Sequence, residues 1–292
     1  MSKTAALQTE EPTTATFETA SIQAPGGTRI GYRQTGTGPG LVLMHGAMMT
    51  SKGFESLAKI LSADFTVYIP DRRGRGMSGP FGLDYGIQTE IDDLGALLQH
   101  TGTHNVFGLS AGATVALHAA RALPEITKLA LYDPPLAAAD GKSPLGWLSR
   151  YEHEMNYGRT ASAFVTVVKA TGDIGGVARL PRFVLTPIMA LMLRLDKGEE
   201  DEAPMRDLLP TVRYDVGMVE SVIADKEFSE LRCDTLLIGG ENSIGYLRAA
   251  QDALEKLLPN VRRVTLSDVG HTAALNGEKP ELVAAELRNL FQ

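Results

Sequence analysis

Short apolar runs of four or five residues recur along this chain, separated by longer segments in which apolar residues repeat every three or four positions. The short runs are typical of buried strands, and the longer segments of amphipathic helices. The predicted strands are 41–44, 65–69, 105–109, 128–132, 235–239 and 262–266, and the predicted helices are 52–63, 85–99, 111–123, 246–258 and 278–291. This alternation predicts an α/β fold, in which helices cover both faces of a mostly parallel sheet.

Two parts of the chain depart from this alternation. Residues 17–24 and 28–34, on either side of Pro25-Gly26-Gly27, predict a hairpin, which brings the expected sheet to eight strands. Residues 134–232 lack a strand pattern and contain helical pieces with Gly and Pro breaks. The predicted organisation is a disordered arm, a core domain in two segments and an inserted helical lid: residues 1–16, 17–133 with 233–292, and 134–232.

The sequence Gly108-x-Ser110-x-Gly112 joins the strand at 105–109 to an alanine-rich helix. A turn this sharp holds the serine in a strained conformation and exposes its hydroxyl, and it tolerates only small residues two positions away on either side. The amide of Ala111, first in the helix, is then free to stabilise an oxyanion. Because Gly and Ser are common residues, a glycine-rich turn without chemistry is the alternative interpretation of this pattern.

Composition narrows the functional classes. The 292 residues are 43% hydrophobic and 22% charged, with a net charge of −7 and no run of Lys or Arg, which argues against a nucleic-acid surface. Cys233 is the single cysteine, so no internal disulfide framework exists. The longest apolar run, Phe183–Leu195, is too short to span a bilayer and contains Pro187. The N-terminus has no apolar core typical of a secretory signal, so we expect a cytoplasmic protein, with a homodimer left open.

Four sequence motifs lie in order at the ends of predicted strands. They are His45-Gly46-Ala47, the segment Asp71–Ser78, the Ser110 turn and Gly270-His271. On these motifs the chain resembles the α/β-hydrolase fold family from Phe17 to the C-terminus. The resemblance implies that Ser110 is a nucleophile and that the amides of Ala47 and Ala111 form an oxyanion hole. It also favours a structural turn over an anion site for the arginines after Asp71.

A serine nucleophile needs a base, and His271 is the one histidine in a loop after the last predicted strand. The third member of the triad departs from the common family pattern, because Ser243 stands where the acid is expected after strand 235–239. The resemblance offers Asp133, after strand 128–132, as the alternative acid position, with Glu241 as a weaker candidate. Pro134 should keep Asp133 extended at the strand end. The predicted catalytic residues are Ser110, His271 and Asp133.

The predicted activity is hydrolysis of a carboxylic ester or lactone. Methionines in the predicted lid and at positions 48 and 49 suggest an apolar cavity for a small-molecule substrate, although they can equally pack lid helices together. Met48 and His45 are the expected substrate contacts. Without metal-ligand spacing or a nucleotide motif, we expect neither a metal nor another cofactor. The alternatives are a non-hydrolytic enzyme with His271 as base (a C–C lyase, a cofactor-independent oxygenase or a cyclisation catalyst) and a ligand-binding receptor.

Overall fold

A computed structural model describes residues 16–136, 146–171, 177, 179–198, 203–221 and 226–292. The predicted arm therefore lies outside the described residues, except for Thr16. The central element is an eight-stranded sheet of order β1-β2-β4-β3-β5-β6-β7-β8. Its strands are β1 Glu18–Gln23, β2 Arg29–Thr35, β3 Gly40–Met44, β4 Thr66–Pro70, β5 Asn105–Leu109, β6 Lys128–Tyr132, β7 Asp234–Gly240 and β8 Val261–Leu266. The predicted number of strands and the mostly parallel sheet are confirmed.

Pairing within the sheet is parallel from β4 through β8, whereas β2 runs antiparallel to both β1 and β4. Successive residues of β3 point to opposite faces of the sheet. Leu41 and Leu43 belong to one hydrophobic cluster and Val42 and Met44 to the other, and none of the four is more than 3% exposed. An uninterrupted apolar run is stable here because both faces of the strand are covered.

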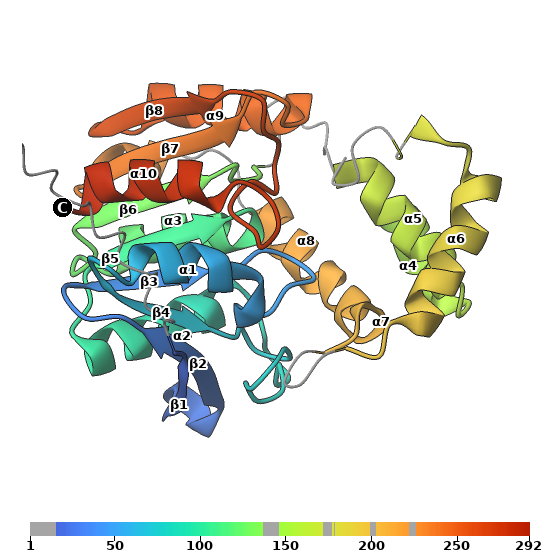
Figure 1. Cartoon of the computed structure of the whole chain (residues 1–292), viewed down its shortest axis with the longest axis horizontal. Helices are drawn as coiled ribbons and strands as arrows, with labels where there is room; N and C mark the ends of the chain where they lie inside the picture. The colour runs from blue at the N-terminus through green and yellow to red at the C-terminus, as the bar shows by residue number, and fades with distance from the viewer. Residues whose placement is uncertain (1–15, 137–145, 172–176, 178, 199–202, 222–225) are drawn as a thin grey trace, which may run out of the picture.

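Helices cover the two faces of the sheet in separate layers (Figure 1). The helices α1 (Glu55–Leu61) and α10 (Pro280–Phe291) pack on one face. On the other face lie α2 (Ile87–Thr101), α3 (Ala111–Ala122) and α9 (Gly245–Leu257). The predicted helix over 52–63 begins instead with a 3₁₀ turn, Ser51–Phe54, before α1.

Between β6 and β7 the described residues form helices and connecting loops, without a strand. This helical insertion consists of α4 Leu148–Asn156, α5 Thr160–Thr171, α6 Arg182–Leu195, α7 Met205–Leu208, a 3₁₀ turn at Leu209–Thr211 and α8 Val212–Ser221, and a second 3₁₀ turn, Lys226–Glu230, precedes β7. It has its own hydrophobic cluster, in which Phe164 of α5 and Leu185 of α6 are buried. Glu154 of α4 joins these helices, since it accepts hydrogen bonds from Ser162 and Arg182.

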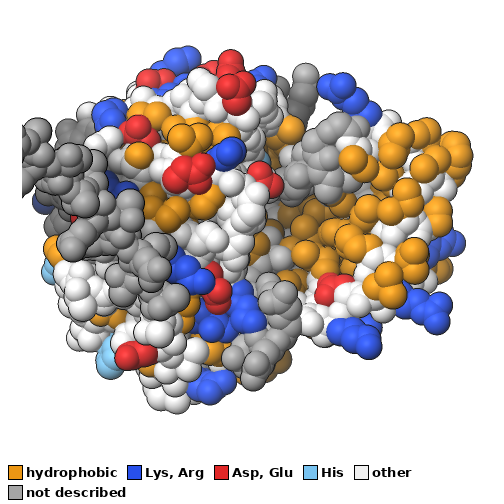
Figure 2. All heavy atoms as spheres, viewed as in Figure 1, with side chains coloured by type: hydrophobic (Ala, Val, Ile, Leu, Met, Phe, Trp, Pro, Cys, Tyr) orange, Lys and Arg blue, Asp and Glu red, His pale blue; other side chains and the backbone are white. Residues whose placement is uncertain are grey.

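The helical insertion has an apolar outer surface. Figure 2 shows hydrophobic side chains over this part of the molecule and in the hollow that separates it from the sheet. On α6 the side chains of Phe183, Leu191 and Leu195 are 79%, 58% and 68% exposed. No helix among the described residues is long and apolar enough to cross a membrane.

Candidate active site

Ser110 lies in the turn between β5 and α3 with φ 54° and ψ −125°. This left-handed conformation is strained for a residue with a side chain. The flanking glycines are required by close backbone contacts: a Cβ on Gly108 would lie 2.6 Å from the Cα of Ala113, and one on Gly112 would lie 2.3 Å from the carbonyl oxygen of Met44. The local sequence therefore forms the sharp turn that its pattern predicts.

The amides expected to hold an oxyanion lie close to Ser110. Ala111 is the first residue of α3, where a helical backbone offers its N–H no acceptor. Ala47 follows β3 and lines the same cavity as Ser110 and Ala111. Gly46 allows this loop to approach, because a Cβ there would be 3.2 Å from the Cβ of Ser110. The structure thus brings the two predicted oxyanion residues close to Ser110.

Asp133 follows β6 and is fully buried. Its Oδ2 lies 3.2 Å from Nδ1 of His271, which stands in the loop after β8. The same oxygen accepts a hydrogen bond of 2.5 Å from the Ser243 hydroxyl, and Oδ1 accepts one of 2.6 Å from Nε2 of Gln251. The structure therefore brings together Asp133 and His271, and it adds two supporting donors that the sequence patterns did not identify.

The backbone of Asp133 differs from the prediction. Its φ of 45° lies in the left-handed region, so the expectation of an extended residue before Pro134 is wrong. Aspartate tolerates this region better than most residues. The amide of Asp133 donates to the carbonyl of Ile238, and its carboxylate is held on both oxygens, so tertiary contacts prevail over the local preference.

Glu241, the weaker acid candidate, contacts the backbone of the loop that carries His271. Its side chain is exposed, and Oε2 accepts a hydrogen bond of 3.3 Å from the amide of Asp268. Ser243, at the usual acid position, instead donates to Asp133. The loop that carries His271 is further fixed by the Tyr132 hydroxyl, which donates to the carbonyl of Gly270 at 2.6 Å.

His45 was expected to contact substrate, but the structure places it away from the cavity. The ring is fully buried, does not line the cavity and is occupied on both nitrogens. Nε2 accepts the backbone N–H of Arg72 at 3.1 Å, so Nδ1 carries the proton donated to the carbonyl of Gly46. Burial, with Arg72 and Arg75 nearby, holds the pKa of His45 well below its usual range. The neutral ring therefore braces the loop that carries Ala47.

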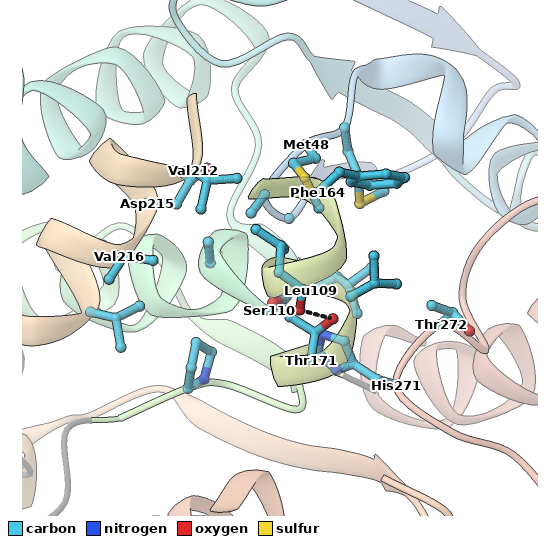
Figure 3. Close-up of a pocket in the computed structure, with 18 of the residues that line it drawn as sticks. Met48, Leu109, Ser110, Phe164, Thr171, Val212, Asp215, Val216, His271 and Thr272 are labelled. Atoms are coloured by element: carbon cyan, nitrogen blue, oxygen red, sulfur yellow. Dashed lines mark hydrogen bonds between the residues drawn. The ribbon is translucent and has the colours of Figure 1, made fainter. Parts of the chain in front are cut away.

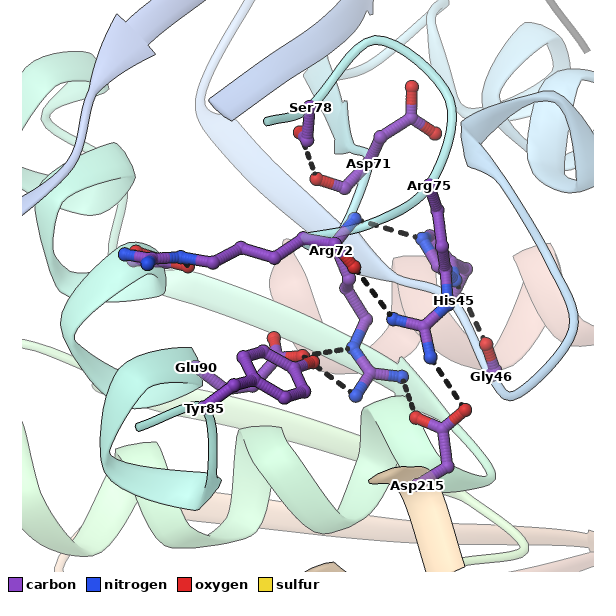
Figure 4. Close-up of polar contacts among 11 residues, drawn as sticks. His45, Gly46, Asp71, Arg72, Arg75, Ser78, Tyr85, Glu90 and Asp215 are labelled. Carbon is purple, nitrogen blue, oxygen red and sulfur yellow. Dashed lines mark hydrogen bonds and ion pairs between the residues drawn. The ribbon is translucent and has the colours of Figure 1, made fainter. Parts of the chain in front are cut away.

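The segment after β4 is a turn whose charged side chains are occupied (Figure 4). Asp71 accepts the backbone N–H groups of Ser51 and Met77 at 2.6 and 2.9 Å, and burial raises the pKa of its carboxyl. Arg73 forms a bidentate pair with Asp93 of α2, with contacts of 2.6 and 2.7 Å. These contacts agree with the structural interpretation of the segment. Arg72 and Arg75 instead pair with a residue of the helical insertion.

A cavity of about 260 Å³ lies between the sheet and the helical insertion (Figure 3). Ser110 and His271 line it together with Met48, as the sequence predicts for that methionine. The insertion contributes mostly apolar side chains: Trp147, Phe164, Val167, Val168, Met205, Val212, Val216 and Val219. Of the methionines in the helical insertion, Met205 lines the cavity, whereas Met189 and Met218 are buried in packing and Met192 is partly exposed. Within the described ranges, no group of three or more His, Cys, Asp or Glu residues could hold a metal ion.

Comparison with known proteins gives a consistent family. The model of the alpha/beta hydrolase family matches residues 41–286. The pimeloyl-[acyl-carrier protein] methyl ester esterase of Stenotrophomonas maltophilia is 27% identical over 265 residues, 86% of this chain and 92% of that protein. The N-formylmaleamate deformylase of Pseudomonas putida is 33% identical over 129 residues, 42% of this chain and 48% of that protein. A solved alpha/beta hydrolase from Sphaerobacter thermophilus has a TM-score of 0.75 at 30% identity and covers 94% of this chain and 100% of its own.

Proposed function

The chain belongs to the alpha/beta hydrolase family, and from that premise we propose that it is a serine hydrolase acting on a carboxylic ester or lactone of a mostly apolar small molecule. The proposal depends on the contact between Asp133 and His271. His271 lines the same cavity as Ser110. An orienting acid, a base and an exposed serine at one cavity are the parts that acyl transfer requires.

In the proposed mechanism the Ser110 hydroxyl attacks the substrate carbonyl while His271 accepts its proton. Asp133 orients the imidazole through Nδ1 and stabilises the positive charge that the ring acquires. The amides of Ala47 and Ala111 donate to the oxyanion of the tetrahedral intermediate. His271 then returns the proton to the leaving alcohol, and water attacks the acyl-enzyme by the reverse sequence.

The character of the cavity supports an apolar substrate. Aliphatic and aromatic side chains of the insertion line the same cavity as Ser110, together with the flexible side chains of Met48 and Met205. We propose that the helical insertion acts as a lid that excludes water from the acyl-enzyme. The esterase relative supports an ester substrate, and the deformylase relative makes a formamide the natural comparison in an assay. A cytoplasmic location and a homodimer stay predictions.

The proposal is tested by comparing the wild type with Ser110→Ala on p-nitrophenyl esters of two to eight carbons. Loss of the nucleophile should lower kcat by more than about 10⁴-fold. A fluorophosphonate probe should label the wild type, and peptide mass spectrometry should find the label on Ser110. Thermal unfolding of both proteins controls for folding.

Equal ester activity in the two proteins, with no labelling, would overturn the proposal. His271 would then be a base in one of the non-hydrolytic reactions, where Ser110 contributes only a hydrogen bond and its loss has a partial effect.

A further inference from the structure

Two guanidinium groups lie behind the wall of the cavity, held by one carboxylate of the helical insertion (Figure 4). Nη1 of Arg72 is 2.8 Å from Oδ1 of Asp215, and Nη2 of Arg75 is 2.6 Å from Oδ2. Both arginine side chains are 0% exposed, and that of Asp215 is 2% exposed. Asp215 therefore occupies a position that a carboxylate ligand would take between two arginines.

The cluster is neutral because a second carboxylate completes it. Oε1 of Glu90 on α2 accepts hydrogen bonds from Nε of Arg72 at 2.9 Å and from the Tyr85 hydroxyl, and it forms an ion pair with Nη2 of Arg72 at 2.8 Å. Burial disfavours the charge on Arg72, but Glu90 and Asp215 more than offset this and raise its pKa above the usual value. Two cations thus face two anions, and removal of the Asp215 charge would leave one uncompensated positive charge.

Asp215 also belongs to the cavity wall. It lines the cavity with Val212 and Val216, which precede and follow it on α8 (Figure 3). Asp215 is the only Asp, Glu, Lys or Arg among the described lining residues. A substrate in the cavity therefore meets a carboxylate whose arginine partners are already occupied.

We propose that Asp215 determines the charge of the substrate by filling an arginine pair that would otherwise bind a carboxylate. With Asp215 present, a substrate carboxylate would be buried beside a like charge, with no Lys or Arg among the described lining residues to pair with it, which is unfavourable. The cavity therefore takes uncharged acyl or alkyl chains. Replacement of Asp215 by a small neutral residue should turn this wall into a carboxylate site. The choice of substrates rests on the proposed ester hydrolysis, whereas the site itself does not.

Binding can be measured without catalysis, because Trp147, the single tryptophan, lines the cavity. The background is Ser110→Ala, and the probes are pentanoate and its neutral analogue pentanamide, followed by Trp147 fluorescence. Addition of Asp215→Ala should tighten pentanoate binding by at least about tenfold, since the carboxylate can pair with both guanidinium groups. Pentanamide binding should change by less than about threefold.

The matched control is Asp93→Ala, which also removes a carboxylate from a buried arginine of the same loop. Asp93 pairs with Arg73 and does not line the cavity, so its loss should not improve pentanoate binding. If Asp93→Ala tightens pentanoate binding as much as Asp215→Ala, or if neither does, the proposal is wrong and Asp215 only anchors α8.

Selectivity gives the second measurement. The substrates are p-nitrophenyl pentanoate and the p-nitrophenyl monoester of succinate, which are similar in length and differ by a terminal carboxylate. In the wild type kcat/KM should favour the neutral ester, and Asp215→Ala should shift the ratio toward the succinate ester by at least about tenfold. An equal fall for both esters would contradict the proposal.

Two further results distinguish a variant that fails to fold from a failure of the proposed ester hydrolysis. If Asp215→Ala does not fold, as judged by circular dichroism, Asp215→Asn is used; it keeps the shape and changes the charge, and it should shift the ratio in the same direction by about threefold. If the wild type hydrolyses neither ester, the proposed function fails, but the Trp147 titration still decides whether Asp215 blocks an anion site.

Discussion

Asp133 and Asp215 are both buried carboxylates near the same cavity, and their partners differ. Asp133 is held by the hydroxyl of Ser243 and the amide of Gln251, which are neutral, and by the ring of His271. Asp215 is held by the guanidinium groups of Arg72 and Arg75. Neutral donors fix a carboxylate and leave its charge free to act on an imidazolium, whereas arginines neutralise it. The partners therefore suit the two aspartates to different roles: Asp133 to orient an imidazole, and Asp215 to compensate buried arginines.

The largest expected effect is on turnover. Asp133→Asn should lower kcat by about 10³–10⁴-fold, because an amide cannot stabilise the imidazolium and favours the wrong tautomer of His271. Steady-state kinetics on a short p-nitrophenyl ester measures this. Glu241→Gln is the control, since its exposed side chain contacts the amide of Asp268 and should leave kcat within about twofold of the wild type.

A second variant tests the role of Asp133 by moving the carboxylate from position 133 to position 243. Ser243 Oγ is 2.5 Å from the Asp133 oxygen that contacts His271, so a carboxylate at position 243 lies within reach of the ring. Addition of Ser243→Asp to Asp133→Asn should recover about tenfold or more of the lost kcat. A loss of activity on Glu241→Gln rather than Asp133→Asn would move the acid role to Glu241.

A smaller effect is expected on stability, and it falls on the other aspartate. Asp215→Asn leaves two buried guanidinium groups with one carboxylate, so the free energy of unfolding should fall by about 3–5 kcal/mol. Urea unfolding followed by circular dichroism measures it. The exposed pair Lys279–Glu281, 4.0 Å apart, provides the control, because Glu281→Gln should cost less than about 1 kcal/mol. Equal effects would mean that Asp215 does not compensate the arginines.

The smallest effect concerns the neutral support of Asp133. Gln251→Leu removes one donor to the carboxylate, a hydrogen bond worth about 1.5–3 kcal/mol, so kcat should fall by about 10- to 100-fold. KM should stay unchanged, because Gln251 does not line the cavity. A rise in KM with constant kcat would show that Gln251 shapes the binding space instead of positioning the acid.

Local patterns made the fold and the serine turn predictable. The run Leu41–Met44 specifies a strand buried on both faces, and Gly108 is required by contacts within the turn itself, whereas Gly112 is required by the backbone of Met44 and His45. The fold class and the family resemblance are confirmed by the sheet and by the family match. The catalytic roles of Ser110, His271 and Asp133 stay predictions, although the structure places all three together.

The rest depends on contacts between residues far apart in sequence. Gln251 lies 118 positions from Asp133, and Asp215 lies 140 positions from Arg75, so no local pattern pairs them. A signal was nevertheless present for each region. Ser243 at the usual acid position requires a carboxylate from elsewhere, and Asp215 falls on an otherwise apolar face of α8, between Val212 and Val216. A single acidic residue on an otherwise apolar helix face indicates that a cation is buried next to it.

The position of Asp133 in the sequence affects whether the helical insertion can be exchanged by recombination between related genes. Because Asp133 directly follows β6, two of the three predicted catalytic residues, Ser110 and Asp133, precede the helical insertion in the chain, and His271 follows it. The Thr114 hydroxyl of α3 donates to the carbonyl of Pro135 at 3.2 Å and holds the chain just after Asp133. Exchange of the insertion alone would therefore leave Ser110, Asp133 and His271 in place, and the incoming insertion would have to supply a carboxylate to Arg72 and Arg75 where Asp215 now lies.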